Sequence, residues 1–237
     1  NAHHTARLDR TPEQEAEWQT LLAQADILFD FDHTHRDDLP ELAHNLKWIQ
    51  ATSAGIGQFV KRQGYDQNDW IFTTASGAHS RPLAEFCLMA MLMFSKNYML
   101  ISKYQAEHRW ERFGNTELMG KTVGIVGLGR IGRDVAKVCK FFDMQVIGTR
   151  RDITKLVDYV DTLYAPDDLD TLLPQVDFLV LATPNTPETE GMISADRIQL
   201  IKKGAVVINI ARGAVVDQPA LTEALSNGHL LGAALDV

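Results

Sequence analysis

The stretch that decides the fold is Val123-Gly124-Ile125-Val126-Gly127-Leu128-Gly129-Arg130-Ile131-Gly132. It combines an apolar, β-rich run with a G-x-G-x-x-G pattern at the point where a strand should turn into a helix. Gly127 permits the tight turn, Gly129 lets the backbone approach a pyrophosphate, and Gly132 allows close packing of helix on strand. The helix N-terminus adds amide donors and a positive dipole end. We therefore predict a dinucleotide-binding turn, the alternative being a glycine-rich turn of purely structural use.

Outward from this turn, short β-rich runs alternate with helical patterns from Lys121 onward. This alternation is typical of consecutive βαβ units and predicts a doubly wound parallel sheet. Several runs lack polar alternation, as strands covered on both faces do. The predicted strands are Thr122–Val126, Gln145–Gly148, Thr162–Tyr164, Phe178–Ala182, Ala205–Ile210 and Leu231–Leu235, with helices at Arg130–Phe142 and after Asp217.

The first 95 residues repeat this theme more weakly, with a helix at Thr11–Gln24 and strands at Ile27–Phe31, Trp48–Ala51 and Ile71–Thr74. The predicted fold class is α/β with two Rossmann-like domains. Residues 1–95 form a smaller α/β domain, and residues 96–237 form the dinucleotide-binding domain. A long helix, Pro82–Tyr104, is more apolar than one buried face requires, which indicates packing at a domain junction or in a dimer; an ordinary buried helix is an equal alternative.

Composition narrows the choice of partners. The chain has 237 residues with 31 acidic and 23 basic side chains, a net charge of −8, and no Lys/Arg block longer than two, which argues against nucleic acid. The longest apolar run, Phe86–Phe94, is far shorter than the ~20 residues that span a bilayer, so no membrane partner is expected. Cys87 and Cys139 suggest neither a disulfide framework nor a metal site, which fits a reducing cytoplasm.

The tip of the second strand distinguishes between cofactors. An acidic residue there suits the ribose 2′-hydroxyl of NAD(H), whereas arginine suits the 2′-phosphate of NADP(H). Here the tip reads Thr149-Arg150-Arg151, and Asp152 falls beyond the expected strand end. Guanidinium groups make charge-assisted, bidentate contacts to phosphate. The sequence therefore favours NADP(H) over NAD(H), against two alternatives: Asp152 as the ribose acid, or two solvated arginines.

Two further loops follow buried strands. Thr183-Pro184 and Thr189 come after the fourth predicted strand, and Ala211-Arg212 come after the fifth. Ligands in open α/β sheets bind at the carboxyl ends of the strands, so the Thr183 loop should face the cofactor. An arginine directly after an apolar strand needs an anionic partner. For Arg212 that partner is a substrate or, in the alternative reading, a structural ion pair.

These features together resemble a family. In order along the chain, the motifs Thr52 to Ile56, Ser76 to Glu85, Gly127 to Gly132, Thr183-Pro184 with Thr189, Asn209 to Gly213 and Ala233 to Val237 look like those of D-2-hydroxyacid dehydrogenases. The resemblance covers nearly all of the chain from about Ala25. It implies that residues 1–95 are a flavodoxin-like substrate domain and that the two-domain fold is incomplete at both ends. The Thr149-Arg150-Arg151 tip looks like the NADPH-preferring hydroxypyruvate and glyoxylate reductase branch.

The resemblance implies roles for individual residues. Arg212 matches the catalytic arginine that holds the substrate carboxylate and polarises the 2-oxo group. Ala54 and Gly55 match the loop whose amides bind that carboxylate, and His79 lies in a motif expected nearby, with a structural role as its main alternative. Cofactor contacts are implied for Ser80, Gly127, Gly129, Arg130, Ile131, Gly132, Thr149, Arg150, Arg151, Thr183, Pro184, Thr189, Ile210, Ala211 and Asp236, the last holding the nicotinamide carboxamide.

In this family a catalytic Glu and then a proton-donating His follow the Asp-Val pair, and we expect both to be encoded beyond Val237; the alternative is a truncated, inactive relative. Glu beside His raises the pKa of the imidazole for proton donation. The sequence thus predicts a cytoplasmic, homodimeric NADP(H)-dependent reductase of small 2-oxo acids. Two rivals share the scaffold: a dinucleotide-sensing regulator or corepressor without turnover, and a dehydrogenase of formate or phosphite type.

Overall fold

The computed structural model describes residues 10–237 and divides the chain into two compact units, Asn1–Ser76 and Gly77–Val237. The division falls earlier than the 95/96 boundary expected from the sequence. Helix α4 (Ser80–Ser95) accounts for the difference, since its buried residues Ala84, Cys87 and Met91 share a hydrophobic cluster with the second unit's Ile125. The apolar helix therefore belongs to the second unit.

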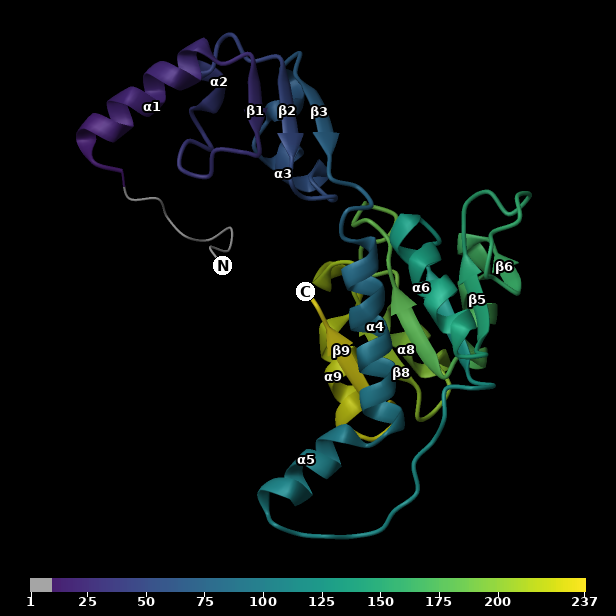
Figure 1. Ribbon diagram of the computed structural model, residues 1–237. Helices are drawn as coiled ribbons and strands as arrows, with labels where there is room; N and C mark the ends of the chain where they lie inside the picture. The colour runs from purple at the N-terminus through teal and green to yellow at the C-terminus, as the bar shows by residue number, and fades with distance from the viewer. Residues whose placement is uncertain (1–9) are drawn as a thin grey trace. The chain divides into compact units, whose positions relative to one another are not determined.

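The second unit is built on a six-stranded, wholly parallel sheet with the order β6-β5-β4-β7-β8-β9 (Figure 1). The sequence prediction of this sheet is confirmed, with strand ends that differ by one residue at most. The order runs outward from β4 in both directions, so a switch point lies between β4 and β7. The strands are β4 (Thr122–Val126), β5 (Gln145–Thr149), β6 (Thr162–Tyr164), β7 (Phe178–Leu181), β8 (Val206–Asn209) and β9 (Gly232–Leu235).

Helices cover both faces of this sheet. Strand β7 shows the two layers, because Phe178 and Val180 pack with α4 and α6 whereas Leu179 and Leu181 pack in the opposite cluster. Figure 1 shows α4 and α6 side by side over one face. Burial on both faces explains why these strands read as continuous apolar runs. The helices are α6 (Arg130–Phe141), α7 (Leu169–Leu172), α8 (Ala195–Leu200) and α9 (Gln218–Ser226), with short 3-10 turns at Pro166–Asp168, Leu173–Gln175 and Gly213–Val215.

The prediction of one helix over Pro82–Tyr104 is wrong. The segment forms α4 and a separate helix, α5 (Tyr98–Ala106), bent by 64°. The break lies at Asn97, which adopts a left-handed conformation with φ 52° and donates from its side chain to Asn115 Oδ1 at 3.1 Å. Asn enters this conformation more readily than most residues. Within residues 10–237 no single helix is long and apolar enough to cross a membrane, although the bent pair reaches that length and composition together.

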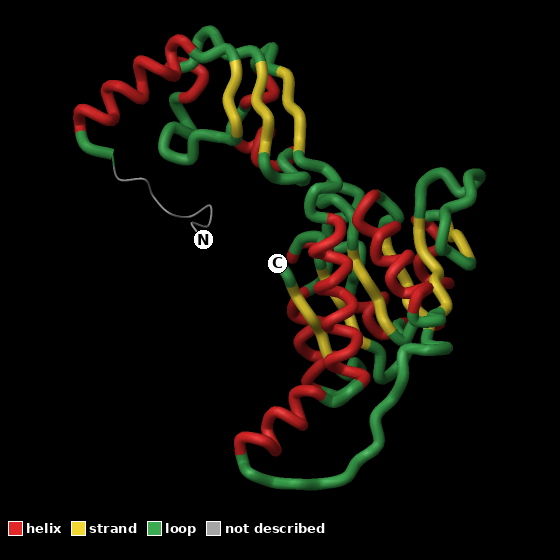
Figure 2. Tube along the Cα trace, in the orientation of Figure 1, coloured by secondary structure: helices red, strands yellow, loops and turns green. Residues whose placement is uncertain are grey.

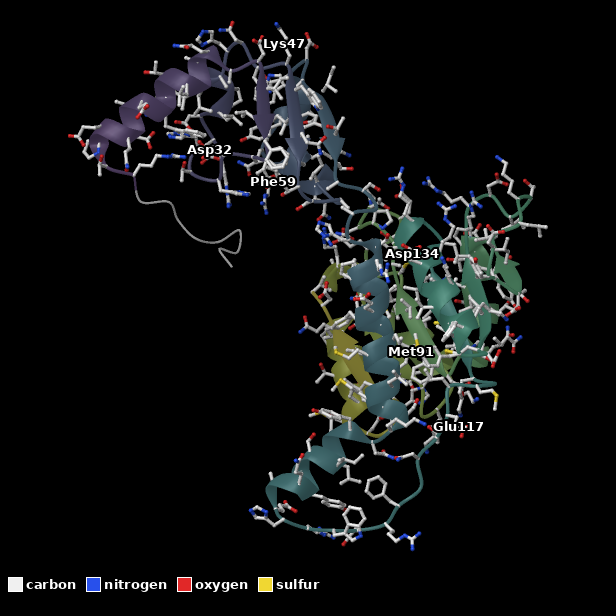
Figure 3. The ribbon with its side chains drawn as sticks, in the orientation of Figure 1. Asp32, Lys47, Phe59, Met91, Glu117 and Asp134 are labelled. Carbon is white, nitrogen blue, oxygen red and sulfur yellow. The ribbon has the colours of Figure 1, made fainter. Side chains whose placement is uncertain are left out.

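The first unit contains a smaller parallel sheet in the order β1-β2-β3, as predicted (Figure 2). Its core is rich in aromatic rings: Phe31 lies 4.7 Å from Phe59, and Tyr65 lies 5.3 Å from Trp70. Figure 3 labels Phe59 within this unit. The elements are α1 (Pro12–Gln24), β1 (Ile27–Phe29), α2 (Leu39–Leu42), β2 (Trp48–Ala51), α3 (Gly57–Arg62), a 3-10 turn (Tyr65–Gln67) and β3 (Ile71–Thr74).

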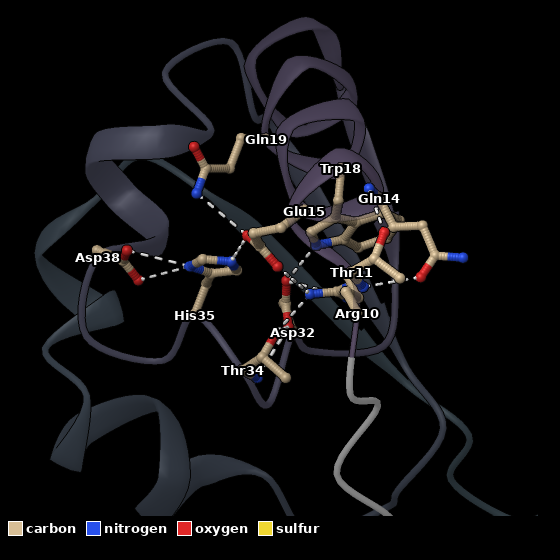
Figure 4. A network of polar contacts seen from close by, with 10 residues as sticks. All are labelled: Arg10, Thr11, Gln14, Glu15, Trp18, Gln19, Asp32, Thr34, His35 and Asp38. Atoms are coloured by element: carbon tan, nitrogen blue, oxygen red, sulfur yellow. Dashed lines mark hydrogen bonds and ion pairs between the residues drawn. The ribbon is translucent and has the colours of Figure 1, made fainter.

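A polar network fixes α1 to the loop after β1 (Figure 4). The Asp32 carboxylate is buried and accepts hydrogen bonds from Trp18 Nε1 at 2.5 Å and from the Thr34 hydroxyl at 2.6 Å. The His35 ring lies between two carboxylates, 2.6 Å from Glu15 and 3.1 Å from Asp38. The contacts of Trp18 with Asp32 and of Glu15 with His35 connect α1 to this loop, so α1 is held by polar side chains as well as by its buried Leu22.

Candidate functional site

In the glycine turn after β4, Gly127 and Gly132 are tightly packed, whereas Gly129 has open space beside it. A Cβ on Gly127, whose φ is +102°, would lie 2.9 Å from the Ala182 carbonyl oxygen, and one on Gly132 would lie 2.2 Å from the Gly127 carbonyl oxygen. Neither position accepts a side chain. A Cβ on Gly129 would meet no described atom within 4 Å. The open side of Gly129 is therefore the one a ligand can approach, as the sequence pattern predicts.

Helix α6 begins at this turn. Gly129 is its N-cap, and among the described residues no side chain caps this end and no acidic residue occupies the first turn. The first helical residue is Arg130, followed by Ile131. A helix N-terminus without a side-chain cap, together with the helix dipole, favours a bound anion such as a phosphate group.

The tip of β5 fastens the glycine turn. The Thr149 side chain is 4% exposed, and its hydroxyl accepts a hydrogen bond from the Gly127 N–H at 3.2 Å. Its carbonyl oxygen accepts one from the Leu128 N–H at 3.1 Å. Arg150 is half-buried and Arg151 is exposed. Thr149 thus shapes the turn. The two arginines lie at the end of the strand, where the 2′-phosphate of NADP(H) is predicted to bind.

Asp152, the alternative ribose ligand, is engaged locally. Its carboxylate accepts hydrogen bonds from the Thr154 hydroxyl at 2.5 Å and the Thr154 N–H at 3.1 Å, and it lies 3.4 Å from Lys155 Nζ. The hydrogen bond from the Thr154 hydroxyl is the main cause of a lowered Asp152 pKa. In this small turn the oxygens of the Asp152 carboxylate accept hydrogen bonds from Thr154. This agrees with the prediction that the two arginines, and not Asp152, contact the cofactor's ribose end.

The loop after β7 is held by hydrogen bonds to its own backbone and contains two buried side-chain oxygens without a partner among the described residues. Thr189 Oγ1 donates to the Pro184 carbonyl at 2.7 Å and accepts from the Thr186 N–H at 2.8 Å, so it fixes the loop's shape. Within residues 10–237, Thr183 Oγ1 and Asn185 Oδ1 are the buried side-chain N or O atoms without a hydrogen-bond partner. Unpaired buried acceptors, the open side of Gly129 and the uncapped helix fit a bound dinucleotide.

The loop after β8 is held by Asn209, a residue that we did not predict as part of the site. It is 2% exposed, its amide Nδ2 donates to the Arg212 carbonyl at 3.0 Å, and its Oδ1 accepts from the Ala211 N–H at 2.9 Å. The signal in the sequence is a polar residue ending an apolar strand. Arg212 itself is exposed, in an extended conformation, with its Nη1 2.6 Å from the Ala211 carbonyl oxygen. Ile210 is 5% exposed and Ala211 4%.

Strand register brings these loops to one edge of the sheet. Val126 pairs with Thr149 on one side and with Leu181 on the other, Leu181 pairs with Asn209, and Asn209 with Leu235. The carboxyl ends of five strands are therefore in line. The residues that immediately follow them are the Gly127 turn, Arg150, the Thr183 loop, the Arg212 loop and Asp236, whose N–H donates to the Asn209 carbonyl at 3.0 Å.

Other predicted residues lie at the start of the second unit or in the first. Ser80 is 7% exposed and its hydroxyl donates to the Gly77 carbonyl at 2.8 Å, so its described contact is local. His79 is exposed and precedes α4. Ala54 and Gly55 are exposed in the loop after β2. Their predicted carboxylate-binding role involves both units and stays a prediction.

A hollow of about 730 Å³ lies elsewhere, between α4 and α6, and is lined by Ala84, Val138, Phe141 and Tyr159 among others. It lies along the helices and not at the carboxyl ends of the strands, where ligands bind in open α/β sheets. The glycine turn and the aligned strand ends therefore define the candidate site. His229 is half-buried, and its Nε2 lies 3.1 Å from the Ile198 carbonyl oxygen.

A doubly wound sheet with a glycine turn and aligned polar loops defines a dinucleotide-binding α/β protein. Residues 88–237 match the family described as D-isomer specific 2-hydroxyacid dehydrogenase, NAD binding domain, and the chain belongs to this family. The pyridine-nucleotide cofactor predicted from the glycine turn agrees with this assignment, and the resemblance noted from the ordered motifs is confirmed.

Three similar proteins place the chain within that family. A D-3-phosphoglycerate dehydrogenase of Methanocaldococcus jannaschii is 36% identical over 202 residues, which cover 84% of this chain and 38% of that protein. A crystal structure of a D-isomer specific 2-hydroxyacid dehydrogenase family protein from Aeromonas salmonicida has a TM-score of 0.85 at 28% identity, covering 94% of this chain and 71% of that one.

The third is an NADPH-dependent glyoxylate/hydroxypyruvate reductase from Sinorhizobium meliloti, solved with NADP and sulfate. Its TM-score is 0.80 at 27% identity, covering 90% of this chain and 67% of that one. The chain spans about two fifths of the length of the Methanocaldococcus relative.

Proposed function

We propose that this chain is the cofactor-binding part of an NADP(H)-dependent reductase of small 2-oxo acids such as glyoxylate or hydroxypyruvate. The observation that carries the proposal is the alignment of the strand ends, which assembles the Gly127 turn, Arg150, Thr183 and the Arg212 loop along one edge. The similar Sinorhizobium enzyme, named for the same substrates and NADPH, supports it.

The cofactor would be held by backbone amides and a few polar groups. The N-terminus of α6, which has Gly129 as its N-cap and no side-chain cap among the described residues, suits the pyrophosphate. Arg150 and Arg151 suit a 2′-phosphate, and Asp236 suits the nicotinamide carboxamide. When bound, NADPH supplies a hydride to the C2 carbonyl carbon, while the protein aligns the reactants.

Arg212 would act on the substrate. Its guanidinium suits the substrate carboxylate, and its charge stabilises the negative charge that grows on the carbonyl oxygen during reduction. The two hydrogen bonds of Asn209 hold the backbone on either side of that arginine. Ala54, Gly55 and His79 are proposed as further substrate contacts, the first two through backbone N–H groups that can bind an anion.

We further propose a homodimer in the cytoplasm. Helix α5 has no buried residue among its described side chains, and it and the following loop expose large apolar side chains, with Met99 67% and Trp110 90% exposed. Apolar patches of this kind mark interaction surfaces. Free, buried Cys87 and Cys139 agree with a reducing compartment. Sedimentation of the full-length protein at micromolar concentration should give twice the chain mass, and a strictly monomeric profile would exclude the dimer.

The test of function is turnover by the full-length protein. We expect oxidation of NADPH with glyoxylate or hydroxypyruvate, measured at 340 nm, with 3-phosphohydroxypyruvate and pyruvate as comparison substrates. Tight cofactor binding with no turnover across this panel would favour a non-catalytic sensor. Replacing Arg150 by Asp should weaken NADPH by roughly tenfold to several hundredfold and NADH much less. Equal losses for both cofactors would remove Arg150 from 2′-phosphate recognition.

A further inference from the structure

Asp30, the residue that follows β1, has an unusual backbone conformation. Its φ is +69°, and among residues 10–76 it is the one non-glycine residue with a positive φ. The left-handed region is unfavourable for a residue with a Cβ, although Asp tolerates it better than most. Such outliers persist where surrounding contacts hold them, and they gather at functional sites. The conformation of Asp30 therefore calls for a reason in its contacts.

Two hydrogen bonds connect Asp30 to the end of β2. Its N–H donates to the Gln50 carbonyl at 2.7 Å, and its carboxylate accepts a hydrogen bond from the Thr52 hydroxyl. A hydrogen bond from a hydroxyl to a carboxylate is charge-assisted and belongs to the stronger kind. Both side chains are half-buried, so water competes for this bond less than at an exposed surface. The residue after β1 is thus bonded to the residue after β2.

Thr52 is the first residue of the loop that carries Ala54 and Gly55. The loop, residues 52–56, forms neither helix nor strand, and Ser53, Ala54 and Gly55 are exposed. Exposed loop residues gain little from packing, so the position of such a loop depends on contacts at its two ends. One end continues into α3, and the other is Thr52. The hydrogen bond to Asp30 therefore fixes the end of the loop next to β2.

The segment that carries Asp30 is itself firmly held. Asp32, two residues further on, is buried, and its carboxylate accepts from Trp18 Nε1 on α1 and from the N–H and hydroxyl of Thr34. Because these contacts fix the loop after β1, Asp30 offers its carboxylate from a rigid support. A positioning contact needs such a support on one side.

We propose that Asp30 is a positioning residue, which through Thr52 holds the loop of residues 52–56 in the conformation that binds the substrate carboxylate. The inference rests on the proposed function, in which the amides of Ala54 and Gly55 contact that carboxylate. A loop that is ordered before the substrate arrives loses less conformational entropy on binding. The negative charge of Asp30 opposes an anion bound nearby, so its acceptor oxygen, and not its charge, improves substrate affinity.

This separation of acceptor and charge defines the variants. Asp30→Gly removes the acceptor and tolerates the left-handed conformation, whereas Asp30→Asn retains an acceptor oxygen, enters the same conformation readily and lacks the charge. Thr52→Val removes the donor at nearly the same shape, and Thr52→Ser retains the hydroxyl. Each disruptive variant thus has a conservative partner at the same position.

The experiment is steady-state kinetics of the full-length wild type, the four variants and the double variant Asp30→Gly/Thr52→Val, with glyoxylate or hydroxypyruvate and NADPH. We expect KM for the 2-oxo acid to rise about five- to tenfold in Asp30→Gly and in Thr52→Val, and no further in the double variant, because both changes remove one interaction. The kcat and the KM for NADPH should change by less than about twofold. Asp30→Asn and Thr52→Ser should restore the low KM of the wild type.

Three results would overturn the inference: an unchanged KM for the 2-oxo acid in both disruptive variants, additive rises in the double variant, or a rise in Asp30→Asn as large as in Asp30→Gly. A lowered melting temperature of the first unit with an unchanged KM would indicate a purely structural contact. Failure of the proposed function is distinguishable, because the wild type itself would then turn over no 2-oxo acid, and the inference would fall with it. If Asp30→Gly does not fold, the Thr52→Val and Thr52→Ser pair decides.

Discussion

The two units use buried polar groups in opposite ways. In the second unit the interior is mainly aliphatic, and the buried Thr149 and Asn209 bind the backbone of loops at the strand ends. In the first unit the interior mixes aliphatic and aromatic side chains, and the buried Asp32 accepts from Trp18 and Thr34 to hold α1. Polar burial thus shapes a ligand site in one unit and fastens a helix in the other.

The largest expected effect is at Gly132. Alanine there would place Cβ 2.2 Å from the Gly127 carbonyl oxygen, a contact that only backbone movement can relieve. We expect Gly132→Ala to destabilise the second unit by about 3 kcal/mol or more and to abolish nucleotide binding. Calorimetry should show the melting transition of the second unit lowered and that of the first unit unchanged.

Gly129→Ala is the matched control, since its Cβ meets no described atom within 4 Å. Stability should change by less than about 0.5 kcal/mol, while nucleotide binding weakens because the methyl group occupies the ligand's approach. Equal stability losses in the two variants would mean that the turn is not packed as described.

The next effect is at Asp32 in the first unit. Asp32→Ala leaves the Trp18 and Thr34 donors without their acceptor, and we expect a loss of about 2 kcal/mol confined to the first unit. The exposed pair of Lys47 and Asp26 provides a control, because Lys47→Ala should change stability by less than about 1 kcal/mol. A similar loss in both variants, measured by denaturant unfolding, would refute the special role of Asp32.

The histidine in the same network predicts that the stability of the first unit depends on pH. Burial acts to lower the His35 pKa, but hydrogen bonds to Asp38 and Glu15 outweigh it and raise the pKa above 6.5. A raised folded pKa gives stability that is fully present below pH 6.5 and is lost as the pH rises through the folded value. The first unit's melting temperature should fall on this rise, and His35→Gln should flatten the dependence. A flat wild-type profile would contradict the described pairing.

The strands of the fold could be predicted from the sequence, whereas the helix break and the division between the units could not. Continuous apolar runs bounded by turn residues predict buried parallel strands, and β4 and β6 matched their predicted bounds in full. The helix break at Asn97 was missed because it depends on a contact with Asn115, far along the chain. The division at Ser76/Gly77 was not anticipated, because the residues of α4 that pack on α6 are indistinguishable in sequence from an ordinary apolar helix.

In the candidate site, residues whose role follows from local backbone chemistry were predictable. Gly127 and Gly132 have no room for a side chain, as the fingerprint implies. Asn209 and Asn185 were not predicted, because their significance lies in burial and in the presence or lack of partners across loops. Thr189 stays a predicted cofactor contact, and its described hydrogen bonds lie within the loop.

The smallest expected effect concerns the two thiols of the second unit. Burial raises the pKa values of Cys87 and Cys139 to about 12, and both side chains are almost wholly inaccessible. A thiol reagent should modify neither in the native protein and both after denaturation, because the thiolate is the reactive form. Rapid modification of either thiol in the native state would show that α4 and α6 separate readily.

The most direct test of the account is Arg212→Lys in the full-length protein. Lysine keeps the charge but loses the planar fork, so kcat/KM for the 2-oxo acid should fall by about a few hundredfold to a thousandfold. The melting temperature and NADPH affinity should stay near wild type, because Arg212 is exposed and the cofactor's phosphates are assigned to the glycine turn and Arg150. Turnover close to wild type, or a lowered melting temperature with kcat/KM intact, would contradict the assignment of Arg212 to the chemistry.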